Sequence, residues 1–169
     1  GFFKALIKYF KASYNIDSNK IFSSGMSLGG FMSYRLACEL EEINSIGSVT
    51  GSMAGYYQCN PPKKSGIIHF HGMNDAVVPY NGVEWSYSAN AAHDFWKNHN
   101  QCNSQNELTI PDFNGDGEYT KRLISYDCEE NKSVELYSLE GEGHTWWKKS
   151  WGHDINTSEL IWQFFQSQQ

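Results

Sequence analysis

The stretch KIFSSGMSLGGFMSYRLACEL, residues 20–40, decides how this chain folds. Its first five residues follow the turn formers Asp17, Ser18 and Asn19 and predict a short strand over 20–24. The residues from 28 to 41 return to a helical pattern. A strand that passes through a glycine-flanked turn into a helix is the basic unit of a parallel α/β sheet.

The same alternation continues on both sides of this stretch. Besides those two elements, the sequence predicts helices over 2–14 and 83–99, strands over 46–50, 66–70 and 133–139, and loops over 55–65 and 100–121. A last helix follows Asn156, which we expect to be its N-cap in a capping box with Glu159. No internal repeat is present, so we expect residues 1–169 to form a single α/β domain, a parallel sheet covered by helices.

The turn itself carries a chemical motif. Gly25-Met26-Ser27-Leu28-Gly29 fits G-x-S-x-G, and its position between a strand and a helix is the one that a nucleophile elbow requires. Small flanking residues allow the strained backbone of such a turn. The Ser27 hydroxyl would then project from the carboxyl edge of the sheet, and the Leu28 amide would serve as an oxyanion donor. The alternative is an ordinary glycine-rich turn between a strand and a helix.

A serine nucleophile needs a base, and the base needs an orienting carboxylate. On this kind of sheet the partners follow in the order serine, acid, histidine. Asp75 comes directly after the apolar strand at 66–70 and is the candidate acid, although a turn-forming aspartate would also fit there. Asp94, Asp112 and Asp116 lie on a helix or in a polar loop and are placed less well.

Six histidines compete for the role of base. His144 follows the last predicted strand in a Gly-Glu-Gly-His loop, where small residues allow the imidazole to return over Ser27. His69 and His71 precede the acid, which is the wrong order, and His93 and His99 belong to the helix at 83–99. His153 is the second choice, and the alternative for any loop histidine is a plain surface role.

Composition excludes several classes of partner. The net charge is −6, no basic block occurs, and no run of residues approaches the roughly 18 apolar residues of a membrane span. We therefore expect neither nucleic acid nor a membrane as partner. The chain is 15% aromatic and only 19% charged, against about 25% charged in an average domain, which favours an extracellular enzyme.

Four cysteines bear on the compartment. Cys38, Cys59, Cys102 and Cys128 form no CxxC pair, so the sequence predicts no zinc site, and no cofactor is implied. Their even number and loop-rich surroundings favour disulfides over reduced thiols, although three pairings are open. A secreted or periplasmic location follows from this interpretation.

One further motif is discounted. Residues 112–117 match the opening of a calcium loop, D-x-N-x-D-G, but Leu123 stands where the bidentate carboxylate should be. We expect a solvated loop there and no metal.

Three segments together resemble a known family. GMSLGGFMSYRLACEL, HFHGMNDAVVPY and LEGEGHTWW, with NHNQC and YDC between them, are similar to the esterase family that groups feruloyl and acetylxylan esterases with polyhydroxybutyrate depolymerases. This resemblance implies a secreted α/β-hydrolase, a three-layer sandwich, with Ser27 as nucleophile, Asp75 as acid and His144 as base. It also implies the disulfides Cys38–Cys59 and Cys102–Cys128.

The resemblance departs at the front of the chain. Members of the family have strands before the elbow strand, and a loop among them supplies a second oxyanion donor. The chain begins at Gly1 inside a helical pattern, so we expect it to correspond to strands five to eight, with an N-terminal segment or second chain elsewhere. The leading strand would then have an unpaired edge.

The function expected is hydrolysis of feruloyl or acetyl esters of plant polysaccharide through an acyl-enzyme. Polyester depolymerisation is the second candidate, a peptidase on the same fold is a further one, and a non-catalytic carbohydrate-binding module is the candidate from another class. Trp146, Trp147 and Tyr80, with Trp151 close by, are the expected substrate contacts. Partly buried packing is the equal alternative for these aromatic side chains.

Overall fold

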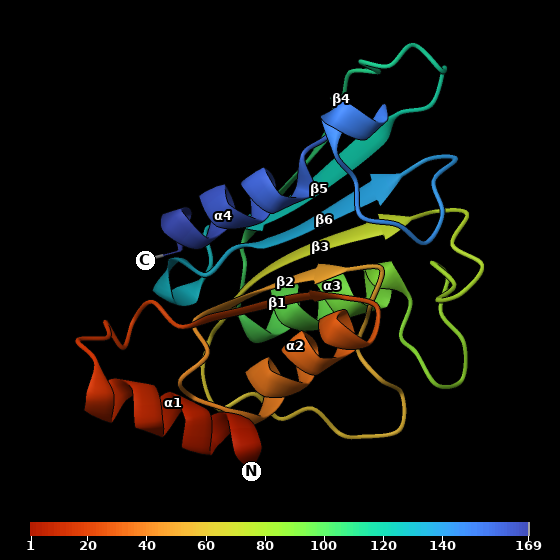
Figure 1. Ribbon diagram of the computed structural model, residues 1–169. Coiled ribbons are helices and arrows are strands. Elements are labelled where there is room, and N and C mark those ends of the chain that lie inside the picture. The colour runs from red at the N-terminus through yellow and green to blue at the C-terminus, as the bar shows by residue number, and fades with distance from the viewer. Residues whose placement is uncertain (169) are drawn as a thin grey trace.

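Six strands form one mixed sheet between two layers of helices (Figure 1). The computed structural model describes residues 1–168. The strands are β1 (Phe22–Met26), β2 (Ser45–Val49), β3 (Gly66–Gly72), β4 (Ser104–Ile110), β5 (Thr120–Tyr126) and β6 (Val134–Leu139). The helices are α1 (Phe2–Ser13), α2 (Leu28–Glu39), α3 (Ala89–His99) and α4 (Thr157–Ser167), with short 3₁₀ turns at Glu129–Asn131 and Lys149–Trp151.

The strand order is β1-β2-β3-β6-β5-β4. Neighbours among β1, β2, β3 and β6 are parallel, whereas β5 and β4 add an antiparallel hairpin. The predicted parallel sheet is therefore present in part, as β1, β2, β3 and β6, whereas the antiparallel hairpin was not predicted. The leading strand β1 lies at an edge of the sheet, as expected. Because parallel strands end at the same side, the loops that follow β1, β3 and β6 leave from one edge of the sheet.

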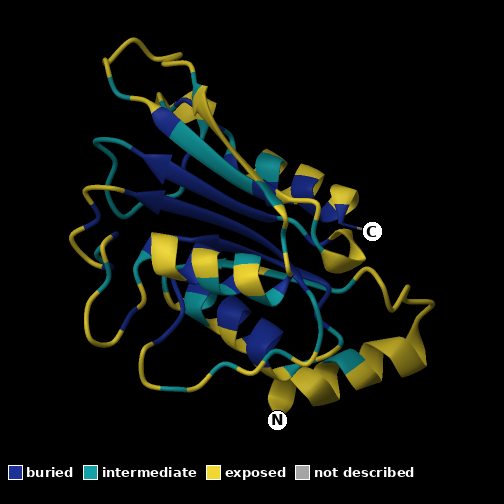
Figure 2. Ribbon diagram, turned by 180° about the vertical axis from the view of Figure 1, so that it is seen from behind, coloured by how far each residue is buried: buried dark blue, intermediate teal, exposed yellow. Residues whose placement is uncertain are grey.

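The hydrophobic core has two halves, one on each face of the sheet. Helices α2 and α3 pack on one face, where Tyr34, Ile67 and Trp96 are completely or almost completely buried. Helix α4 packs on the other face, against Ile68 and Phe70. Alternate residues of β3 thus serve opposite layers, which is why this strand is buried on both sides. Helix α1 contributes no buried residue and lies beside the main body (Figure 2).

The prediction for residues 100–121 was wrong in part. This stretch was expected to be loop, but β4 and the beginning of β5 lie within it. β4 is the edge strand of the hairpin, and its residues are exposed or half-buried. A strand held mainly by backbone pairing to one neighbour needs no apolar alternation, so the usual signal was absent.

The helix predicted over 83–99 begins later, at Ala89. Ser88 is its N-cap, and the Ser88 hydroxyl accepts a hydrogen bond of 3.0 Å from the amide of Ala91. Gly82 has φ +77° and supports a tight turn just before this segment. The turn and the serine cap therefore fix the start of α3.

Helix α4 begins where predicted, but its capping box does not form. Asn156 is the N-cap without a capping hydrogen bond. Its Oδ1 accepts a bond of 2.9 Å from the Lys149 amide instead, and its Nδ2 donates to Glu159 at 3.3 Å. Because Asn156 Oδ1 accepts from the Lys149 amide, it does not accept from the first amides of the helix.

Both disulfides implied by the family resemblance are present. Cys38 is bonded to Cys59 and Cys102 to Cys128. The first ties the end of α2 to the loop before β3, and the second joins the segments that flank the β4–β5 hairpin. Such bonds are typical of proteins from oxidising compartments. Within residues 1–168, no helix has the length and apolar character that crossing a bilayer requires.

Candidate active site

Ser27 occupies a strained turn between β1 and α2. Its backbone has φ 55° and ψ −119°, a region that non-glycine residues rarely adopt and that costs about 1–3 kcal/mol. The Ser27 amide donates to the Val49 carbonyl at 2.8 Å, which ties the turn to β2. Although Ser27 is the N-cap of α2, its hydroxyl makes no capping hydrogen bond. The side chain is half-buried, and its oxygen remains available for other chemistry.

Close contacts explain Gly25, Gly30 and Gly51 at this turn, whereas a Cβ on Gly29 would meet no atom within 4 Å. A Cβ on Gly25 would lie 2.7 Å from the backbone of Gly29, so a larger residue cannot fit there without a shift. A Cβ on Gly51 would lie 2.5 Å from the Ser27 carbonyl oxygen, and one on Gly30 would meet the Ser48 hydroxyl. The motif indicated Gly25 and Gly29, but nothing in the sequence pattern marked Gly51, which comes from the loop after β2.

Leu28 begins helix α2 and its side chain is 82% exposed. The first amides of a helix have no partner within the helix and carry its positive dipole end. The backbone N–H of Leu28 is therefore the kind of donor that an anionic oxygen beside Ser27 would meet.

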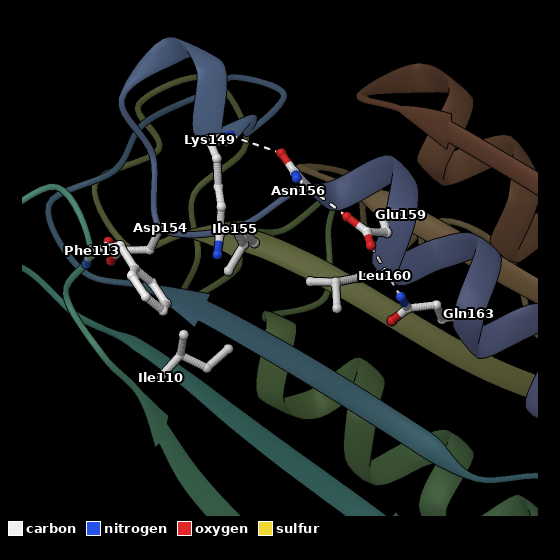
Figure 3. A pocket seen from close by; sticks show the side chains of 9 residues that line it. All are labelled: Ile110, Phe113, Lys149, Asp154, Ile155, Asn156, Glu159, Leu160 and Gln163. Atoms are coloured by element: carbon white, nitrogen blue, oxygen red, sulfur yellow. Dashed lines mark hydrogen bonds between the residues drawn. The ribbon is translucent and has the colours of Figure 1, made fainter.

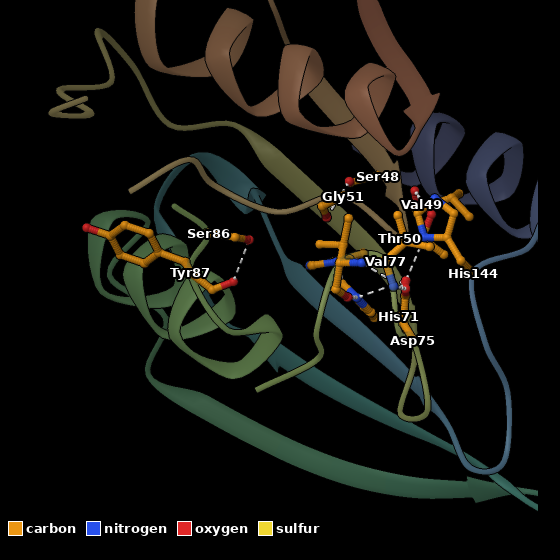
Figure 4. Close-up of polar contacts among 12 residues, drawn as sticks. Ser48, Val49, Thr50, Gly51, His71, Asp75, Val77, Ser86, Tyr87 and His144 are labelled. Atoms are coloured by element: carbon orange, nitrogen blue, oxygen red, sulfur yellow. Dashed lines mark hydrogen bonds and ion pairs between the residues drawn. The ribbon is translucent and has the colours of Figure 1, made fainter. Parts of the chain in front are cut away.

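Asp75 and His144 are joined by a hydrogen bond. Their Nδ1 and Oδ2 atoms are 2.7 Å apart, and the two side chains point toward one another (Figure 4). The carboxylate of Asp75 is fully buried, whereas the His144 side chain is 18% exposed. The other oxygen, Oδ1, accepts the amides of Val77 and Val78 at 2.8 and 2.9 Å. All these contacts fix the carboxylate in one orientation.

The three residues arise from the same edge of the sheet. Ser27 follows β1, Asp75 follows β3 and His144 follows β6. Only β2 lies between β1 and β3 in the sheet. The loops that follow β1 and β3 therefore begin about 10 Å apart, which is two strand spacings. In the part of the chain that the structure describes, His144 is bonded to Asp75, and no hydrogen bond joins it to the Ser27 hydroxyl.

A buried row of polar side chains adjoins Asp75. The Tyr34 hydroxyl is 3.0 Å from His69 Nδ1, His69 Nε2 is 3.0 Å from His71 Nδ1, and His71 Nε2 is 2.8 Å from the Val78 carbonyl oxygen. Burial lowers the pKa of His69 well below its ordinary value, and it lowers the pKa of His71 as well. Sequence order excluded both histidines as the base but gave no sign of this row.

His153, the second choice as base, is engaged elsewhere. Its Nδ1 lies 2.5 Å from a carboxylate oxygen of Glu142. This pair belongs to the loop after β6, beside His144 in the sequence. It is a separate contact that does not involve Asp75.

The structure corrects the predicted substrate contacts. Trp147 is completely buried among the core residues that α4 covers, and Tyr80 is 7% exposed with its hydroxyl bonded to Ser138 at 2.7 Å. Both side chains are enclosed by packing, the alternative given above, and neither offers a surface to a substrate. Trp146 is half-buried and its indole N–H donates to Ser158, whereas Trp151 is 60% exposed.

A cavity of about 260 Å³ lies between the β4 end and the start of α4 (Figure 3). Its wall includes Ile110, Phe113, Lys149 and Leu160, and the Lys149 ammonium group lies 3.9 Å from the centre of the Phe113 ring. Ser27, Asp75 and His144 do not line it. The cavity is therefore separate from the Asp75–His144 pair.

The loop at 112–117 is closed by its own hydrogen bonds. The Asp112 carboxylate accepts the amides of Gly115 and Gly117 at 2.6 and 2.9 Å, which lowers the pKa of Asp112. Across residues 1–168, no three His, Cys, Asp or Glu side chains are grouped to hold a metal ion.

Comparison with known proteins points to esterases. The chain is 25% identical over 152 residues to a bifunctional acetylxylan esterase/xylanase of Neocallimastix patriciarum, an alignment that covers 83% of this chain and 20% of that protein. It is 37% identical over 87 residues to a probable feruloyl esterase C of Aspergillus clavatus, covering 48% and 30%. It is 25% identical over 169 residues to feruloyl esterase D of Neurospora crassa, covering 97% and 53%.

These similarities define the class of protein that the chain resembles, carboxylic ester hydrolases, at low identity. The chain spans about half of the length of these relatives or less. No protein-family profile matches it.

Proposed function

We propose that this chain carries the catalytic centre of a serine carboxylester hydrolase, with Ser27, Asp75 and His144 as its triad. The observation that carries the proposal is the Asp75–His144 hydrogen bond at the sheet edge from which the strained Ser27 turn also leaves. The similarity to feruloyl and acetylxylan esterases supports the same chemistry.

The proposed reaction proceeds in two steps. His144 Nε2 takes the proton from the Ser27 hydroxyl as the oxygen attacks the ester carbonyl, and it then protonates the departing alcohol. Water, activated by the same imidazole, attacks the acyl-enzyme and releases the acid. Asp75 accepts a hydrogen bond from the Nδ1–H of His144, which leaves Nε2 free to act as the base and stabilises the imidazolium.

The negative oxygen of each tetrahedral intermediate needs donors. The Leu28 amide at the start of α2 is the first one in this proposal. The family resemblance implies a second donor from a loop ahead of the elbow strand. Loss of one such donor typically costs about 10²–10³ in turnover.

Feruloyl or acetyl esters on plant polysaccharide are the proposed substrates. The names of the three relatives favour these acyl groups. The exposed ring of Trp151 carries the Lys148 ammonium group 4.2 Å from its centre, and its other face would be the stacking surface for a sugar or cinnamoyl group. The disulfides favour a secreted or periplasmic location for such an enzyme. A polyester of hydroxybutyrate is the second candidate substrate, and it is included in the comparison of substrates below.

Covalent labelling tests the proposed nucleophile directly. A fluorophosphonate probe should label the wild-type chain on Ser27, and Ser27→Ala should lose both the label and hydrolysis of p-nitrophenyl acetate. Ser24→Ala is the matched control, because Ser24 is an exposed serine on β1, the strand that leads into the Ser27 turn, and its loss should leave labelling unchanged. Label on Ser27→Ala, or hydrolysis by that variant at the wild-type rate, would refute the assignment.

The preferred ester is found by comparison of substrates. Methyl ferulate, acetylated xylan and short hydroxybutyrate oligomers should be hydrolysed at different kcat/KM values, with the first two ahead. An absence of all hydrolysis and labelling, combined with retention on a xylan column, would favour the carbohydrate-binding module instead.

A further inference from the structure

Two buried histidines on β3 lie directly behind the acid of the proposed triad. His69 and His71 are two residues apart on a strand, so their side chains leave the same face of the sheet. His69 is 1% exposed and His71 is fully buried. The proposed reaction does not use either of them, yet they form a continuous row of hydrogen bonds from Tyr34 to the acid loop.

The direction of every hydrogen bond in the row follows from its last member. The Val78 carbonyl oxygen can only accept, so His71 Nε2 carries a hydrogen. In a neutral His71, Nδ1 is then an acceptor, and the hydrogen between the two rings must belong to His69 Nε2. His69 Nδ1 in turn accepts from the Tyr34 hydroxyl. Burial keeps the pKa of both imidazoles below the ordinary value, which favours this neutral arrangement.

The row ends on the peptide groups that orient Asp75. Val78 accepts from His71 through its carbonyl oxygen and donates through its amide to Asp75 Oδ1. His71 Nε2 also lies 3.5 Å from Asp75 Oδ2, the oxygen that His144 uses. His71 thus bonds the turn whose amides donate to Asp75 Oδ1, and its Nε2 lies close to Asp75 Oδ2.

We propose that His71 is a positioning residue for Asp75, and that His69 and Tyr34 fix the tautomer in which it works. This inference rests on the proposed function, because Asp75 matters for turnover only if His144 is the base. Without the His71 donor, the Val78 carbonyl would be buried and unsatisfied, and the 75–78 turn would relax to find another partner. The Asp75 carboxylate would then lose the orientation that presents Oδ2 to His144.

A role in packing alone is the alternative. The Tyr80 ring stands edge-on to His71 with centroids 5.7 Å apart, so the imidazole also fills space in the core. The two roles differ in what they require. Packing needs the ring shape, whereas positioning needs a donor at the place of Nε2.

Two substitutions separate shape from hydrogen bonding. His71→Phe keeps a flat ring and removes the donor, and His71→Gln loses the ring but carries an amide donor at a similar reach. His93→Gln is the matched control, because His93 is a buried histidine on α3 that bonds Ser125 and lies outside the row. Each variant is measured in the whole chain for kcat, KM and thermal unfolding.

We expect His71→Phe to lower kcat by about 10²-fold with KM unchanged, since a misplacement of about 1 Å can have that effect. His71→Gln should recover most of the loss, and His93→Gln should keep the kcat of the wild type. The proposal is wrong if His71→Phe and His93→Gln have the same kcat, or if His71→Phe is more active than His71→Gln.

Nitrogen-15 NMR of the histidine rings tests the row without reference to activity. The wild type should show His69 and His71 as neutral tautomers protonated on Nε2, with a downfield Nδ1 proton on His144 from its bond to Asp75. That proton signal should weaken or exchange faster in His71→Phe and persist in His93→Gln. A His71 protonated on Nδ1 overturns the proposal, even if a variant fails to fold.

The two proposals can therefore fail separately. The wild type could hydrolyse no ester while the His71→Phe variant loses the His144 proton signal. That result would contradict the proposed function and support the positioning role of His71. If the wild type is active and the His71→Phe variant keeps both the His144 signal and the kcat, the proposed function is supported and the positioning role of His71 is contradicted.

Discussion

Replacement of Asp75 by Asn should reverse the tautomer of His144. The amides of Val77 and Val78 both donate to Oδ1, so an asparagine must keep its oxygen at that position. Its NH₂ group then takes the place of Oδ2 and donates toward His144 Nδ1, which is 2.7 Å from Oδ2 in the structure. His144 must accept at Nδ1 and carry its hydrogen on Nε2, where it cannot take a proton from Ser27.

The expected loss of kcat is large, because Asp75→Asn retains the positions of the three side chains but leaves His144 Nε2 protonated and unable to act as the base. A comparable change in a serine protease triad lowers kcat about 10⁴-fold. At 1.36 kcal/mol per factor of ten, that loss corresponds to about 5.4 kcal/mol of transition-state stabilisation. The structure suggests a similar magnitude here, since two backbone donors leave the amide no alternative orientation.

Hydrolysis of p-nitrophenyl acetate measures the effect, with circular dichroism to show that the fold is intact. Asp94→Asn is the matched control, because the Asp94 side chain is 66% exposed on α3 and should not affect turnover. If Asp75→Asn retains a kcat within about tenfold of the wild type, the reasoning on the triad is refuted.

Three further outcomes follow from packing and burial. Gly25→Ala should lower the free energy of unfolding by about 1–3 kcal/mol in urea, whereas Gly29→Ala, whose Cβ meets no atom within 4 Å, should not lower it as much. Trp147→Ala should cost about 3–5 kcal/mol in the same assay, while Trp151→Ala should leave stability unchanged and weaken binding to xylan. His93→Gln should make stability less sensitive to acidification below pH 6.5, because burial lowers the His93 pKa in the folded chain and the unfolded chain therefore takes up that proton first. An unchanged slope of stability against pH would contradict this last argument.

The sequence predicted those elements whose physical signal is local. The G-x-S-x-G turn, the apolar run of β3 and the order of the loops after β1, β3 and β6 were enough to expect Asp75 and His144 at one sheet edge. These features follow from strand direction and from steric limits at a tight turn. The roles of the three residues in catalysis stay predictions.

Features that depend on distant partners could not be predicted. β4 is a strand because β5 offers it backbone donors and acceptors, not because its own side chains alternate. Trp147 follows the His144 loop in sequence, but the core under α4 takes up its ring. The row through His69 and His71 reaches the acid loop only because Val78, in a loop after the strand, folds back beside His71.

The conformation of Ser27 gives a last prediction, which separates stability from activity at one position. A serine at a helix N-cap normally caps the helix, a contribution of about 1 kcal/mol, but Ser27 makes no capping bond. Its φ of 55° adds strain of about 1–3 kcal/mol, which glycine does not suffer.

Ser27→Gly should therefore be more stable than Ser27→Ala, since both lack the hydroxyl and only alanine keeps the strain. The greater freedom of glycine in the unfolded chain lowers the stability of the glycine variant by about 0.5–1 kcal/mol. We therefore expect the free energies of unfolding in urea to differ by about 1 kcal/mol, with the glycine variant the more stable. Both variants should be inactive toward p-nitrophenyl acetate. An alanine variant as stable as the glycine variant would show that the turn carries no strain, and the argument that Ser27 is held there at a cost to stability would fail.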